Sequence, residues 1–115
     1  MVTTTTSGSF TSAAPYSLST AIQCHGRPVL VIANGYVYSS SYAANITVTI
    51  SRDTTTLATI NNYATKNTSS NFNASVLDMP TTAGTYLYSC TVATNSGTAK
   101  FDANTYPPRL IVCEL

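Results

Sequence analysis

The stretch Asn45-Ile46-Thr47-Val48-Thr49-Ile50-Ser51 alternates strictly between polar and branched apolar residues. Successive side chains of a β-strand point to opposite faces of a sheet. Ile46, Val48 and Ile50 therefore share one face, and the hydroxyl and amide side chains share the other. The pattern predicts a strand with one face on a hydrophobic core and the other in water.

Other segments also have the residue pattern of strands, and turn-forming residues separate them. Residues 29–33 are continuously apolar, which indicates a strand that is covered on both faces. The last segment, residues 109–115, is apolar on both faces as well. Residues 61–70 are polar, and we expect a surface loop there. Further strands are expected at residues 17–22, 56–60, 71–77, 85–94 and 98–101, the last of these pairing back onto 85–94.

Turn signals lie between these segments. Asn34-Gly35 stands between two apolar runs, and it predicts either a tight hairpin or a bulge within one long strand. The sequence alone leaves both open. Asp53 and Asp102 are typical turn residues, which stabilise their own backbone.

The pattern as a whole predicts an all-β fold of about eight strands. Strands at this spacing favour an antiparallel two-sheet β-sandwich, in particular a jelly roll. We assign residues 15–115 to this single domain. Residues 1–14 have no core-forming period, so we expect an extended N-terminal arm. The arm is expected to lie on a partner surface or to pack along its own domain, and both alternatives stay open.

The composition excludes several classes of function. Charged residues make up 8% of the chain, against about 25% in a typical domain. The net charge is +1 and the five basic residues are scattered, which argues against nucleic-acid binding. No stretch is long and apolar enough to cross a membrane. Surface charges normally oppose self-association, and this chain has few of them. The composition therefore favours a protein that functions within an assembly.

Few residues of this chain are of the types that act in catalysis or bind metals. An odd number of cysteines without a CxxC motif argues against a disulfide framework and a zinc site, so we expect Cys90 and Cys113 to be buried free thiols. His25 adjoins Cys24, but neighbours on a strand point to opposite faces and no acid is close enough in the sequence to orient the imidazole. The four acidic residues are far apart. We therefore predict no enzyme activity, no metal and no cofactor.

The terminal strand predicts an assembly. A two-sheet sandwich covers only one side of each sheet, whereas residues 109–115 are apolar on both. A neighbouring subunit is one way to cover the second side, and the arm or a loop of the same chain is another. We predict a homotrimer whose subunit interface includes Leu110, Val112 and Leu115.

Five stretches carry a resemblance to a known class of proteins. They are Arg27-Pro28-Val29-Leu30-Val31-Ile32, Ile46-Thr47-Val48-Thr49-Ile50-Ser51-Arg52-Asp53, Ala83-Gly84-Thr85-Tyr86-Leu87-Tyr88, Gly97-Thr98-Ala99 and Leu110-Ile111-Val112-Cys113-Glu114-Leu115. Over roughly residues 15–115 the chain resembles phage virion proteins with tumour-necrosis-factor-like or C1q-like jelly rolls. The resemblance implies a trimeric structural protein without catalytic residues, either a capsid decoration (cement) protein or the tip of a tail fibre.

We expect the chain, which begins at Met1, to be a whole gene product without a fibre shaft, and this favours the decoration protein. The arm is then a clasp on the major capsid protein, through Thr3, Thr4, Thr5, Thr6 and Phe10. Such a protein is made in the host cytoplasm and lies on the outer capsid surface of the virion. The alternative is a trimeric receptor- or glycan-binding tip of a tail fibre. A small adhesin or carbohydrate-binding module is a third class.

Overall fold

The computed structural model describes residues 3–7, 16–39, 44–64, 68–94, 99–100 and 108–115. The regular elements of this part of the chain are strands, with no helix among them. In chain order they are β1 (Thr3–Ser7), β2 (Tyr16–Cys24), β3 (Val29–Ser39), β4 (Ala44–Arg52), β5 (Thr55–Ala64), β6 (Thr68–Asp78), β7 (Gly84–Thr94), β8 (Ala99–Lys100) and β9 (Arg109–Glu114).

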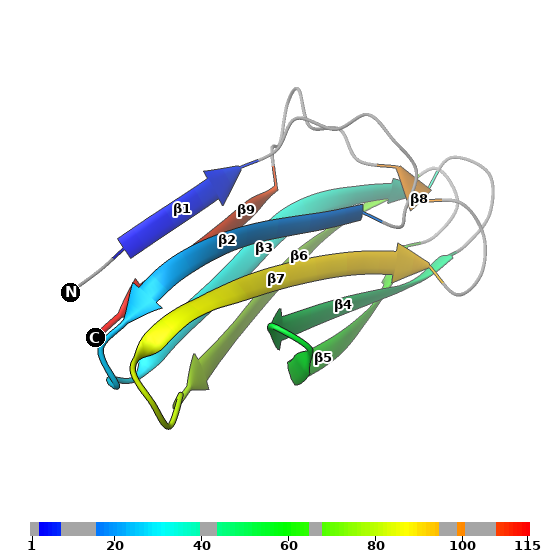
Figure 1. Ribbon diagram of the computed structural model, residues 1–115. Coiled ribbons are helices and arrows are strands. Elements are labelled where there is room, and N and C mark those ends of the chain that lie inside the picture. Colours follow the sequence, from blue (N-terminus) through cyan, green and yellow to red (C-terminus); the bar gives the residue numbers. More distant parts are fainter. Residues whose placement is uncertain (1–2, 8–15, 40–43, 65–67, 95–98, 101–107) are drawn as a thin grey trace.

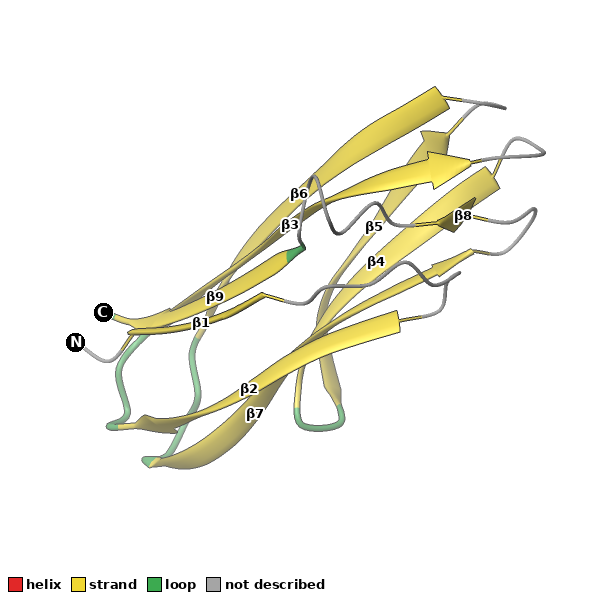
Figure 2. Cartoon of the chain, turned by 90° about the horizontal axis from the view of Figure 1, so that it is seen from above, coloured by secondary structure: helices red, strands yellow, loops and turns green. Residues whose placement is uncertain are grey.

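The strands form two antiparallel sheets that lie one above the other (Figures 1 and 2). The first sheet has the order β1-β9-β3-β6, with the two-residue β8 beside β3, and the second has the order β2-β7-β4-β5. When β8 is set aside, the remaining strands are distributed between the sheets as in a jelly roll of two Greek keys. The predicted fold class and its jelly-roll topology are thus confirmed.

The core lies between the sheets and follows the predicted alternation. Ile46, Val48 and Ile50 are at most 1% exposed, and Thr47 on the opposite face donates a hydrogen bond of 3.2 Å to Asn61 Oδ1 on β5. Alternate residues of β6 and β7 are buried in the same way, among them Phe72 and Ala74 on β6 and Tyr88, Cys90 and Val92 on β7. The buried apolar residues are Leu18, Ile22, Cys24, Val29, Val31, Ala33, Ile46, Val48, Ile50, Phe72, Ala74, Tyr88, Cys90, Val92, Leu110 and Val112.

Asn34-Gly35 is neither a hairpin nor a bulge against β6. β3 continues through it to Ser39 and pairs with β6 without a register shift. The glycine is needed for space and not for a turn. A Cβ on Gly35 would lie 2.7 Å from two ring carbons of Phe72 and 3.3 Å from Pro108 Cβ. Glycine therefore lets the Phe72 ring pack directly against the β3 backbone.

The expected loop at residues 61–70 is wrong for most of its length. β5 continues to Ala64 along β4, and β6 begins at Thr68 along β3, while residues 65–67 lie outside the described part. Polar side chains are compatible with a strand whose backbone is paired by a neighbour, because β-propensity depends on tertiary context. The strand expected at 98–101 is also placed differently. Its described residues, β8, pair with β3 in the opposite sheet and not with β7.

The N-terminal segment joins the fold. β1 pairs with β9 from Thr3 opposite Cys113 to Ser7 opposite Arg109, and it forms the edge of its sheet. This is the packing along its own domain that the sequence left open. The remainder of the expected arm, residues 8–14, lies outside the described part of the chain.

Candidate functional site

Charged residues end the apolar face of several strands at one end of the sandwich. Arg52 follows the buried residues of β4, Asp78 those of β6 and Glu114 those of β9, each at a position that continues the core-facing alternation. Asp78 and Glu114 both stand opposite Val29 of β3, on its two sides. The hydrophobic core therefore gives way to a layer of polar groups at this end.

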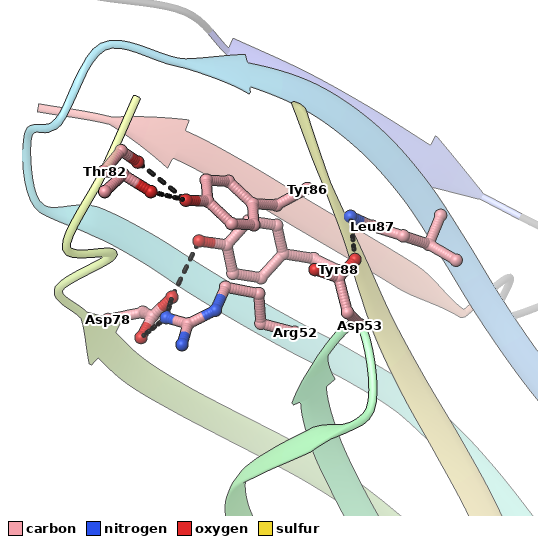
Figure 3. A network of polar contacts seen from close by, with 7 residues as sticks. All are labelled: Arg52, Asp53, Asp78, Thr82, Tyr86, Leu87 and Tyr88. Atoms are coloured by element: carbon pink, nitrogen blue, oxygen red, sulfur yellow. Dashed lines mark hydrogen bonds and ion pairs between the residues drawn. The ribbon is translucent and has the colours of Figure 1, made fainter. Parts of the chain in front are cut away.

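Asp78 is the centre of a contact between the two sheets (Figure 3). The Arg52 Nη1 atom donates to both carboxylate oxygens of Asp78 at 2.6 Å, and the Tyr88 hydroxyl donates to Asp78 Oδ2 at 2.8 Å. The hydrogen bond to Asp78 raises the pKa of Arg52. Burial, followed by the hydrogen bond to Asp78, raises the pKa of Tyr88 far above its usual value. Arg52 therefore stays charged and Tyr88 stays a donor at ordinary pH.

The same network holds the connection between β6 and β7. The Arg52 guanidinium lies 5.6 Å from the centroid of the Tyr86 ring, within the range of a cation–π contact. The Tyr86 hydroxyl donates to the backbone carbonyl of Thr82 at 2.7 Å and lies 3.0 Å from the Thr82 hydroxyl (Figure 3). Residues that precede β7 are thus tied to the end of β4.

Asp53 acts on a neighbouring strand as well as on its own turn. Its backbone has a φ of 49°, in the left-handed region that aspartate tolerates better than most residues. Its backbone N–H donates to the Leu87 carbonyl at 2.7 Å, and its carboxylate accepts from the Leu87 N–H at 3.0 Å (Figure 3). Asp53 lies in the turn after β4, as expected, and it also extends the pairing of β4 with β7 by one position.

A second polar contact joins the loop after β2 to the end of β9. Glu114 is 2% exposed and accepts from the His25 backbone N–H at 2.5 Å and from His25 Nδ1 at 2.8 Å. The hydrogen bonds from His25 lower the pKa of Glu114, with a smaller effect from the Arg27 backbone. Gly26, with a φ of 80°, lets the loop turn around the carboxylate. The expectation that no acid orients His25 is wrong, because Glu114 does so. Glu114 lies 89 positions away in sequence, so the residues near His25 do not reveal it.

These contacts link strands and loops of the two sheets, and the thiol beside them is poorly placed to act as a nucleophile. The Cys24 thiol is 1% exposed, and its pKa is raised by burial and then by the nearby charges of Glu114 and Asp78. A protonated, enclosed thiol is unsuited to attack a substrate. Within the ranges that the structure describes, no three His, Cys, Asp or Glu side chains gather as metal ligands. The same part of the chain contains no helix long and apolar enough to span a membrane.

The residues proposed for capsid contact are only partly within the described chain. Thr3, Thr4, Thr5 and Thr6 belong to β1, where their backbones pair with β9. Phe10 lies outside the described residues. Contact of this segment with another protein stays a prediction.

The residues proposed for the subunit interface fall on two different faces. Leu110 and Val112 have no exposed surface, because they pack in the core of the single chain. Leu115 is 51% exposed. Packing between the two sheets therefore accounts for Leu110 and Val112, and of the three only Leu115 is available at the surface of one chain.

Sequence reasoning missed the polar layer, although a signal for it exists. Arg52, Asp78 and Glu114 each occupy the next core-facing position after an alternating apolar run. A charge at such a position predicts a buried, paired side chain. The partners themselves are distant in sequence, so the alternation identifies the residues but not their pairing.

The comparisons with known proteins find similarity in fold only. No protein-family model matches the chain, and no curated protein matches it by sequence. A chain in a structure of infectious bursal disease virus, Gx strain, has a TM-score of 0.67 at 12% identity, covering 96% of this chain and 31% of that chain. A chain in the T13 IBDV viral particle has a TM-score of 0.48 at 14% identity, with 96% and 32% covered. The present chain spans about a third of the length of each, and the first likeness supports the jelly-roll fold.

Proposed function

We propose that this chain is a non-enzymatic structural protein of a virus particle, and specifically a decoration (cement) protein on the head of a bacteriophage. The observation that carries the proposal is the jelly-roll order β1-β9-β3-β6 facing β2-β7-β4-β5. Jelly rolls recur in viral capsid proteins. The fold alone does not define a function, but the use of the buried polar groups for internal contacts supports a structural role.

A cement protein stabilises a shell by binding where shell subunits meet. Because it binds the assembled shell and not the separated subunits, it shifts the equilibrium toward the shell by mass action. The low charge of this chain favours apolar and hydrogen-bonded contacts, so binding should depend only weakly on salt. No catalytic group is required.

The expected partners are the major capsid protein and further copies of this chain. β1 stands at the edge of its sheet, so one of its sides is open to a partner strand in the described part of the fold. The segment with Thr3, Thr4, Thr5, Thr6 and Phe10 is our candidate for the capsid contact. We propose a homotrimer with β9 near its axis, on the outer surface of the virion.

The experiment adds the purified chain to phage heads that lack decoration and measures occupancy and heat resistance. We expect saturable binding and a higher temperature of head disruption. A Val48→Asp chain is the control, because a charge in the core is expected to prevent folding. Absence of binding to heads together with binding to host cells would instead support a tail-fibre tip.

A further inference from the structure

Residues 25–28 form the loop between β2 and β3, and hydrogen bonds join this loop to the end of β9. The Glu114 carboxylate accepts from the His25 backbone N–H at 2.5 Å through Oε2 and from His25 Nδ1 at 2.8 Å through Oε1. The Leu115 backbone N–H donates to the Pro28 carbonyl at 2.9 Å. We call this loop, together with Glu114, the end latch.

The loop of the end latch has little apolar packing of its own. His25, Gly26 and Arg27 are exposed, whereas Cys24 before the loop and Val29 after it are at most 1% exposed. Segments with few buried apolar contacts open at a lower cost in free energy than the strands of a core. The position of the loop therefore depends mainly on its hydrogen bonds to β9.

The contact at Glu114 requires an ionised carboxylate. An ionised carboxylate only accepts hydrogen bonds, whereas a protonated one carries an O–H donor on one of its oxygens. Oε2 faces a backbone N–H, which cannot become an acceptor. Oε1 faces the His25 ring at Nδ1, and both nitrogens of an imidazolium are donors. In acid, a proton on either oxygen therefore meets another donor, and one of the two hydrogen bonds is lost.

The other ionisable groups at this end of the sandwich do not replace the loop as the partner of this carboxylate. Arg52 and Tyr88 are both bound to Asp78. Burial, and then the charges of the two carboxylates, raise the pKa of Cys24, so its thiol stays neutral. Among the described side chains, His25 is the one that pairs with Glu114. The groups linked to Glu114, directly or through Cys24, are Cys24 on β2, His25 and the Arg27 backbone in the loop, Arg52 on β4, Asp78 on β6 and Tyr88 on β7.

We propose that acid releases the end latch: protonation of the Glu114 side chain detaches residues 25–28 from β9 while the two sheets stay paired. The pairing of β3 with β6 and of β4 with β7 rests on backbone hydrogen bonds, which do not titrate. Release uncovers the end of the core beside Cys24, which directly precedes the loop. The event is a local opening and is distinct from unfolding of the whole chain.

The direction of the pH dependence follows from the pKa of Glu114. The hydrogen bonds from the His25 side chain and backbone hold this pKa below its usual 4.5 while the loop is closed. The open loop then binds a proton at higher pH than the closed loop does. The stability of the closed loop is therefore present above the pKa of the open form, and it is lost as the pH falls through the pKa of the closed form.

The experiment is amide hydrogen exchange of the full chain by nuclear magnetic resonance between about pH 7 and about pH 3, corrected for the intrinsic pH dependence of exchange. The amides of His25 and Leu115 report on the end latch, and the amide of Val48, on a strand paired on both sides, reports on the core. The test variants are Glu114→Gln, which removes the charge, and His25→Ala, which removes one donor. The matched control is Asp53→Asn, because the Asp53 carboxylate also accepts from a backbone N–H but in a different turn.

We expect protection of His25 and Leu115 to fall at least about tenfold more than that of Val48 in acid, because bonds to a charged group are lost. Glu114→Gln should show this low protection already at neutral pH, and His25→Ala should reach it at a higher pH than the native chain. Asp53→Asn should match the native chain at residues 25 and 115.

Equal losses of protection at the end latch and at Val48 would overturn the proposal, since they would mean unfolding of the whole chain. Native protection of the His25 amide in Glu114→Gln at neutral pH would overturn it as well. If Glu114→Gln does not fold, the His25→Ala variant decides, and release at the same pH as in the native chain would contradict the end latch.

Discussion

The Arg52 Nη1 atom lies 2.6 Å from both carboxylate oxygens of Asp78, and the two residues end strands that belong to different sheets. Because Asp78 also accepts from Tyr88, its carboxylate joins β6 of one sheet to β4 and β7 of the other. The sandwich is therefore closed at this end by directional polar contacts. Hydrophobic packing alone would leave the two sheets free to adjust their relative position.

Replacement of Asp78 tests this link. Asp78→Asn should lower the free energy of unfolding by about 2 to 3 kcal/mol, since it leaves the Arg52 charge without its partner. The loss stays below the full cost of breaking a buried pair because the Arg52 side chain is 22% exposed. Tyr88→Phe removes only a hydroxyl and should cost about 1 kcal/mol. Urea denaturation measures both, and equal losses in the two variants would contradict a charged centre at Asp78.

Glu114 should make the protein sensitive to acid. The hydrogen bonds from His25 and Arg27 hold the pKa of Glu114 below its usual 4.5 in the folded chain. The unfolded chain then binds a proton at higher pH than the folded chain does. The contribution of Glu114 to stability is present above the unfolded pKa and is lost as the pH falls through the folded value.

The measurement is urea unfolding of the native chain and of Glu114→Gln between about pH 7 and about pH 3, a range that brackets the ordinary carboxyl pKa. The gap in stability between them should be largest near neutral pH and should shrink in acid. His25→Ala keeps the carboxylate but loses the bond from Nδ1, so its pH dependence should lie between the other two. Parallel curves for the native chain and Glu114→Gln would show that this carboxylate does not couple to folding.

Gly35 should tolerate no side chain. Gly35→Ala places a methyl group 2.7 Å from ring carbons of Phe72, which is 3% exposed and enclosed by the core. We expect a loss of about 2 kcal/mol from this overpacking. Gly84→Ala is the control, because its nearest contact would be at 3.9 Å, and it should change stability by less than about 1 kcal/mol.

A second substitution tests whether the loss of stability in Gly35→Ala comes from the contact with Phe72. Phe72→Leu shortens the side chain that the added methyl group would meet, so the double change should cost less than the sum of the two single changes. Thermal and urea unfolding report the difference. Strict additivity would mean that the glycine acts through the backbone and not through Phe72.

The cysteines should differ in reactivity. Cys24 and Cys90 are buried, and burial raises the pKa of Cys90 to about 12, whereas Cys113 is partly exposed on the outer face of β9. The expectation that Cys113 is fully buried is therefore wrong. A thiol reagent should label Cys113 first in the native protein, and the other two only after unfolding. Mass spectrometry after digestion locates the label, and rapid native labelling that persists in Cys113→Ser would contradict this order.

Much of the fold follows from local patterns in the sequence. The alternation in residues 45–51 places Ile46, Val48 and Ile50 on the core, because the side-chain period of a strand is two. The same rule assigns Phe72 and Ala74 of β6, and the number of such segments indicates a sandwich. At the next core-facing position of β4 and of β9, the same rule places Arg52 and Glu114. A charge at such a position needs a partner.

Local alternation was enough to specify most of the strands and the face that each of those strands buries. Pairing between distant segments settled the rest: Thr3–Ser7 completes a sheet and Asn34-Gly35 stays extended. It also brought Glu114 to His25 across 89 positions. The physical reason is that alternation specifies the orientation of a side chain, whereas pairing depends on backbone hydrogen bonds and packing between segments far apart in the chain.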